Sequence, residues 1–210
     1  MSLINLAPYV VLLSVVDVLR FIAVFAIAML SWVAYKRTGR AVFAFTASGF
    51  TAILIGIVLR YLAVIMANQN ALCLGCIGFE AFFAYFYASI TMMVFGAWLV
   101  AFAYVKRFHW ALIALSMLVA LLAVRFALTS FPAFTLTLAF LFGFIAIRTF
   151  VAARRSKRAF ATSFAFFLIS VSFVLESFWR SAAWLFPLGE VVGLVGFVIL
   201  AVVLVRVWLR

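Results

Sequence analysis

The chain has 210 residues, of which 71% are hydrophobic, compared with roughly 45–50% in an ordinary soluble domain. Its 16 basic and 4 acidic residues give a net charge of +12. This composition excludes a soluble globule, a disordered tail and a disulfide-rich secreted module, because too much apolar surface would remain once any core had filled. The length allows one domain, or at most two small ones.

Seven apolar runs are long enough to cross a membrane as helices, since about 20 residues at 1.5 Å each span a hydrocarbon core of roughly 30 Å. In chain order they cover residues 8–32, 41–67, 75–105, 110–129, 132–152, 159–185 and 188–208. Short separators divide them, among them residues 36–40, 68–70 and 187–189. Transmembrane strands would be shorter, about 9–11 residues, and would alternate in polarity. We therefore expect an all-α bundle of seven transmembrane helices that forms one domain over residues 1–210.

The basic residues are sorted to one side of the expected membrane. With seven spans, the loops after the first, third and fifth spans share a side with the C-terminal segment. Together with the adjacent helix ends, this side holds twelve basic residues and no acid: Lys36, Arg37, Arg40, Lys106, Arg107, Arg148, Arg154, Arg155, Lys157, Arg158, Arg206 and Arg210. The loops on the other side contain no lysine or arginine. Because short cytoplasmic loops are rich in Lys and Arg, we expect an integral protein of the cell or cytoplasmic membrane with its N-terminus outside and its C-terminus inside.

These inner charges also identify the expected partner. Topology alone accounts for them, and each basic residue near anionic headgroups contributes about 1 kcal/mol of attraction. They form short clusters rather than one long stripe, which argues against nucleic acid. The lipid bilayer is therefore the expected partner of this surface.

Two parts of the sequence resemble each other. Residues 33–41 can be laid over residues 151–159 with five of nine positions identical. Downstream, Arg60 corresponds to Arg180, and Glu80 corresponds to Glu190. This similarity predicts a parallel internal repeat of residues 8–105 and 132–208, joined by a linker helix over 110–129. Chance likeness between two basic loops is the alternative explanation.

In outline, a 3+1+3 arrangement with an outside N-terminus looks like the SWEET and PQ-loop transporters of sugars and amino acids. The resemblance is one of topology. The chain has no Pro-Gln pair, and its prolines, Pro8, Pro132 and Pro187, lie at outer helix ends rather than inside spans. None of that family's functional residues is therefore carried over.

Eight charged residues remain inside the expected spans, all in their outer halves, and their charges sum to zero. They are Asp17, Arg20, Arg60, Glu80, Arg125, Glu176, Arg180 and Glu190. A charge at the bilayer centre costs at least about 2.5–3.5 kcal/mol, so such side chains face the bundle interior and pair. Asp17 and Arg20 share a helix face, as do Glu176 and Arg180. Arg60, Glu80, Arg125 and Glu190 have no partner at helical spacing on their own helix, so they must pair across helices.

Two hypotheses follow for this set. In the first, the charges line an outward-opening pathway for a small polar solute or ion, which makes the chain a transporter or channel. In the second, they form a closed ion-pair network that fixes helix register in a non-transporting subunit, which scaffolds or senses within a larger membrane complex. A water-filled cavity at the charges would favour the first, and dry ion pairs beside a broad exposed face of small residues would favour the second.

Other sites and chemistries are less well supported. Cys73 and Cys76 form a CxxC without a thioredoxin-like unit, which predicts a loop disulfide or two free thiols. A zinc site is not expected, because His109 lies at the inner boundary and both cysteines lie outside. One histidine cannot supply bis-His haem ligation, and all three lysines lie in inner loops, which excludes a retinal Schiff base. We expect no cofactor, no metal and no enzymatic activity, because no nucleophile–base constellation is present.

The last expected span carries a surface of small residues. Gly189 and Gly193 form a GxxxG motif, and Gly196 continues the same surface. Such surfaces permit close helix packing. The packing partner is either another helix of this bundle or another subunit, in a homo-oligomer or a mixed membrane complex.

Overall fold

The computed structural model describes residues 7–72, 78–104, 131–153, 157–178, 181–182 and 184–208. These contain six helices: α1 (Ala7–Thr38), α2 (Ala41–Leu72), α3 (Gly78–Ala103), α5 (Phe131–Ala153), α6 (Lys157–Ser177) and α7 (Leu185–Trp208). All six are long and apolar enough to cross a membrane. The chain is therefore an all-helical, multi-pass membrane protein. The predicted span over 110–129 lies outside the described residues.

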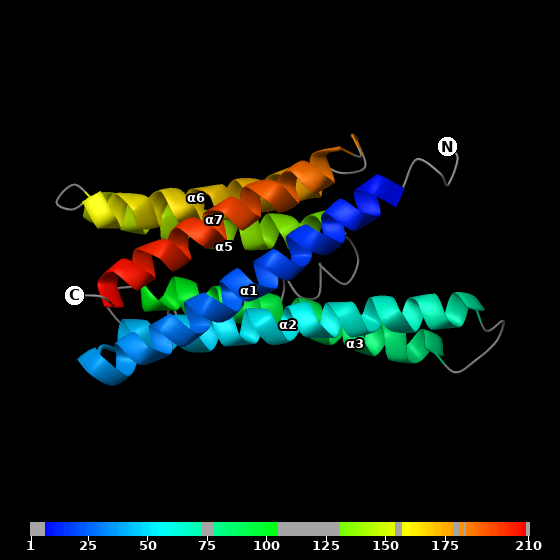
Figure 1. Cartoon of the computed structure of the whole chain (residues 1–210), viewed down its shortest axis with the longest axis horizontal. Coiled ribbons are helices and arrows are strands. Elements are labelled where there is room, and N and C mark those ends of the chain that lie inside the picture. The colour runs from blue at the N-terminus through cyan, green and yellow to red at the C-terminus, as the bar shows by residue number, and fades with distance from the viewer. Residues whose placement is uncertain are drawn as a thin grey trace.

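The helices lie side by side in alternating directions. Helices α1, α3, α5 and α7 run one way, and α2 and α6 run the other way (Figure 1). As a result, α3 ends and α5 begins at opposite ends of the bundle. The two ends of the described chain likewise lie at opposite ends (Figure 1).

Two groups of helices make up the bundle, and α1 joins them. Helix α2 packs along α3, while α6 packs between α5 and α7. Helix α1 crosses obliquely between the groups and contacts both α2 and α7 (Figure 1). The direct contact between the groups, α3 against α5, is smaller than any of these. Side chains on α1 are therefore placed to interact with both groups.

Several predicted boundaries are wrong. The sixth span was expected to reach residue 185, but α6 ends at Ser177 and α7 already begins at Leu185. Pro187 thus lies in the first turn of α7, where its missing N–H costs nothing because first-turn amides have no helical acceptor. The amide-rich separator at 68–70 is also helical, since α2 continues to Leu72. Polar residues at a helix end need not break the helix.

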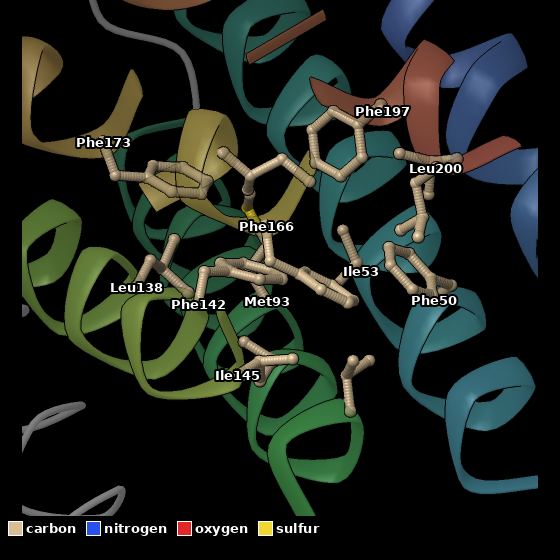
Figure 2. Close-up of a cluster of buried hydrophobic side chains, with 14 of the residues drawn as sticks. Phe50, Ile53, Met93, Leu138, Phe142, Ile145, Phe166, Phe173, Phe197 and Leu200 are labelled. Atoms are coloured by element: carbon tan, nitrogen blue, oxygen red, sulfur yellow. The ribbon is translucent and has the colours of Figure 1, made fainter. Parts of the chain in front are cut away.

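The core between the two groups is rich in phenylalanine (Figure 2). Phe142 of α5 stacks on Phe166 and Phe173 of α6, with ring centroids 6.1 Å and 5.8 Å apart. Across the core, Phe50 of α2 meets Phe197 of α7 edge to face, at 6.4 Å. These rings fill the interior of the bundle beside the charged residues at one of its ends.

Glycines set the closest helix contacts. A Cβ at Gly49 would lie 2.6 Å from the Gly96 carbonyl oxygen, so α2 and α3 touch through their backbones. On α7, a Cβ at Gly189, Gly193 or Gly196 would likewise meet atoms of α6. The small-residue surface of α7 is therefore covered by α6 of the same chain. It is used for packing within the bundle.

Candidate functional site

Five charged residues from four helices meet near one end of the bundle. Helix α1 contributes Asp17 and Arg20, α2 contributes Arg60, α6 contributes Glu176 and α7 contributes Glu190. Each lies at most six residues from the same end of its candidate span. We call these five residues the charge cluster. It lies where α1 bridges the two helix groups.

Arg20 is the centre of the charge cluster. Its Nη1 lies 2.6 Å from Oε2 of Glu190, and its Nη2 lies 3.5 Å from Oε1 of Glu176. Nη2 also donates a hydrogen bond to the main-chain carbonyl of Glu190, at 3.4 Å. The side chains of Arg20, Glu176 and Glu190 are only 7%, 2% and 1% exposed. One buried guanidinium therefore serves two buried carboxylates.

Helix α7 makes room for this guanidinium. A Cβ at Gly193 would lie 2.6 Å from Nη2 of Arg20 and 2.8 Å from Oγ of Ser172. One turn away, a Cβ at Gly189 would lie 2.8 Å from the Ser172 carbonyl oxygen. The glycines thus let α6 and α7 approach each other while Arg20 reaches between them. The Phe197 ring lies 5.9 Å from the guanidinium carbon, within the range of a cation–π contact.

The rest of the charge cluster is half-buried. Nη2 of Arg60 lies 3.8 Å from Oδ1 of Asp17 and 3.8 Å from Oε1 of Glu190. The Arg60 and Asp17 side chains are 32% and 21% exposed. The neighbouring Tyr61 donates a hydrogen bond to the Asp17 carboxylate. At 3.8 Å, Arg60 makes ion pairs that are too long to be hydrogen bonds.

A small cavity lies beside Arg20. It measures about 10 Å³, which is room for about one water molecule. All six described helices contribute to its lining, and apart from Arg20 the lining is apolar, for example Met93, Leu138 and Phe142. Arg20 Nε and both carboxylate oxygens of Glu190 have no partner in hydrogen-bonding geometry within the described chain. The 2.6 Å contact between Arg20 and Glu190 is therefore an ion pair whose groups are poorly aligned for a hydrogen bond.

Cross-helix pairing was predicted for Arg60, Glu80, Arg125 and Glu190, and it is confirmed for Arg60 and Glu190. Asp17 and Arg20, although they share a helix face, make their ion pairs with other helices. Glu80 lies in the first turn of α3, and its side chain is outside the described part. Four predicted residues lie outside the described residues altogether: Cys73, Cys76, Arg125 and Arg180.

Sequence reasoning did not single out three contributors to this site. Tyr61 and Phe197 were not among the predicted site residues, and Gly193 was noted for helix packing alone. For two of them, the position next to a charged residue is the signal in the sequence that could have identified them. Tyr61 follows Arg60 directly, and Gly193 lies three residues after Glu190 on the same face of α7.

The opposite end of the bundle is basic. Lys36 and Arg37 lie in the last turn of α1, and Arg206 lies in the last turn of α7. All three are exposed, as are Arg40 and Arg148. Among the described residues, no three His, Cys, Asp or Glu side chains are grouped so that they could hold a metal ion. Comparison with protein-family models, with curated proteins and with solved structures finds no match for this chain.

Proposed function

We propose that the chain is a membrane transporter or channel for a small polar solute or ion, and that its pathway passes through the charge cluster. What supports the proposal is the position of Arg20, which joins α1 to α6 and α7 and also lines the cavity shared by all six described helices. Charged residues inside a membrane mark substrate and ion pathways. Transporter sites commonly lie between two helix groups that rock against each other.

In this proposal, the two helix groups move relative to each other during transport. Their direct contact through α3 and α5 is small, while α1 and the charge cluster connect them. A rocking motion that separates α2 from α7 would lengthen the pair between Arg60 and Glu190, which is already 3.8 Å apart. Water and solute would then reach Arg20 from the half-buried edge at Asp17. The closed arrangement is, in this proposal, the occluded state.

The alternative function is a non-transporting subunit that scaffolds or senses within a larger membrane complex. The burial of Arg20, Glu176 and Glu190 favours it, because closed ion pairs can fix helix register without moving anything. The other feature expected of such a subunit, a broad exposed face of small residues, is not what α7 offers, since α6 covers its glycines. Along its exposed face, α7 carries large apolar side chains, among them Val195, Val198 and Val202.

Reconstitution into liposomes tests the proposal. Purified wild-type protein should produce flux of at least one member of a panel of inorganic ions, sugars and amino acids. Asp17→Asn and Glu176→Gln should each change that flux. A control is Lys36→Gln, which removes an exposed charge at the opposite end of the bundle. Wild-type flux that neither cluster variant alters would overturn the pathway, and absence of any flux would favour the subunit.

A further inference from the structure

The charge cluster contains more acid than base. The described side chains bring the following charged and titratable groups to it, and Arg180, four residues after Glu176, lies outside the described residues. Helix α1 brings Asp17 and Arg20, α2 brings Arg60 and Tyr61, α6 brings Glu176, and α7 brings Glu190. The α3 and α5 side chains that line the adjacent cavity, Met93, Leu138 and Phe142, are apolar. With three carboxylates and two guanidiniums all ionised, the cluster would carry one uncompensated negative charge.

The contacts show which carboxylate is compensated least. Glu190 faces both guanidiniums, with Arg20 at 2.6 Å and Arg60 at 3.8 Å. Asp17 faces Arg60, accepts a hydrogen bond from Tyr61 and is partly open to its surroundings. Glu176 contacts Arg20 alone among these cations, at 3.5 Å, and is 2% exposed. Arg20 is also the cation that Glu190 neutralises, at the shorter distance of 2.6 Å.

Glu176 and Glu190 thus share one buried cation, and Arg20 lies closer to Glu190, at 2.6 Å, than to Glu176, at 3.5 Å. Two carboxylates that share one cation in a poorly hydrated site do not readily ionise together.

We propose that Glu176 is a proton-binding site, occupied by one proton when the bundle is closed. The proton makes the five-residue cluster neutral: Asp17 balances Arg60, Glu190 balances Arg20, and Glu176 is an uncharged acid. Opening of the half-buried edge would hydrate Glu176 and release the proton to water. The site does not depend on the proposed transport, because a non-transporting bundle would need the same neutralisation.

Infrared difference spectroscopy of the purified full-length protein in lipid vesicles tests the site without measuring flux. A carbonyl stretching band of a protonated carboxylic acid should be present at neutral pH and should disappear at alkaline pH. Glu176→Gln should abolish this band, and the control variant Tyr61→Phe, which leaves all five charged residues in place, should retain it. A band that persists in Glu176→Gln, or a wild type without any such band at neutral pH, would overturn the proposal.

Thermal stability identifies which of the two buried glutamates carries the proton. Glutamine mimics a protonated glutamate in shape, so Glu176→Gln should keep the wild-type unfolding temperature and lose its decrease at alkaline pH. Glu190→Gln should lower that temperature at neutral pH, because Arg20 loses its close anionic partner. The reverse order, or a Glu176→Gln protein that does not fold, would contradict the assignment. Stabilisation of wild type by added sodium or potassium, with no carboxylic acid band, would show a bound cation in place of the proton.

Discussion

Arg20 occupies the centre of the charge cluster because its planar guanidinium can contact two carboxylates at once. Its two terminal nitrogens point to carboxylates on two different helices, Glu176 on α6 and Glu190 on α7. Guanidinium geometry suits such divided contacts, whereas an ammonium group is a single point charge. Lysine at position 20 could therefore hold one carboxylate closely but not both.

Removing this guanidinium should be strongly destabilising. We expect Arg20→Met to lower the free energy of unfolding by about 3–5 kcal/mol, because it leaves an ionised carboxylate buried without its partner. The double variant Arg20→Met/Glu190→Gln should recover most of that loss, since no unpaired charge then remains. Unfolding in detergent micelles measures both. If the double variant were no more stable than Arg20→Met, the pair would not be the source of the loss.

The closest helix–helix contacts in this protein lie at glycines, where no side chain separates the two backbones. Helices α2 and α3 meet at Gly49 and Gly96, and α6 and α7 meet at Gly189, Gly193 and Gly196. Lipid tails are as apolar as leucine, so close packing rather than hydrophobic burial must hold such helices together. The sequence motif pointed to α7 but not to the α2–α3 contact, whose glycines are on separate helices and form no motif.

A methyl group at Gly49 should loosen the α2–α3 pair. The added Cβ would lie 2.6 Å from the Gly96 carbonyl oxygen and 3.0 Å from the Val100 amide nitrogen, and backbone atoms cannot turn aside. We expect Gly49→Ala to destabilise by about 1–3 kcal/mol, which outweighs the helix propensity gained. The control is Gly143→Ala, whose nearest neighbour is the rotatable Ser170 hydroxyl at 3.1 Å. Equal stability of the two variants would contradict a backbone contact at Gly49.

At the scale of the whole molecule, charge is divided between the two ends of the bundle. The mixed charge cluster lies at the end where α1 begins, and exposed basic residues such as Lys36, Arg40 and Arg206 lie at the other end. The positive-inside rule applied to this distribution predicts that the basic end faces the cytoplasm. The structure places the two ends relative to each other, and the membrane decides which one faces inward.

Cysteine labelling in intact cells tests this orientation. Cys73 and Cys76, after mild reduction, should react with a membrane-impermeant maleimide added outside. In a chain with both of these replaced by serine, Arg40→Cys should react only after the membrane is permeabilised, since residue 40 is exposed at the basic end. Labelling of Arg40→Cys in intact cells would mean that the chain inserts in the opposite direction.

Much of the architecture could be predicted because it depends on local composition. Helices α1, α2, α3, α5, α6 and α7 each correspond to a predicted apolar run. The errors lie at helix ends, where hydropathy does not register that Pro187 fits a first helical turn or that residues 68–70 can remain helical. The internal repeat and the span over residues 110–129 stay predictions. Helix α2 contacts both α1 and α3, and helix α6 contacts both α5 and α7, as a repeat of three helices would require.

The sequence by itself determined that the chain is a helical membrane protein, because length and hydropathy are properties of each segment alone. It also placed Asp17, Arg20, Arg60, Glu176 and Glu190 inside spans that the structure has. It also required that Arg60 and Glu190 find partners on other helices. Only the tertiary structure decided that Arg20 pairs with Glu176 and Glu190, which are 156 and 170 residues away. Helical spacing relates residues on one helix. Which helices touch is set by glycine contacts and aromatic packing, and these act across the whole chain.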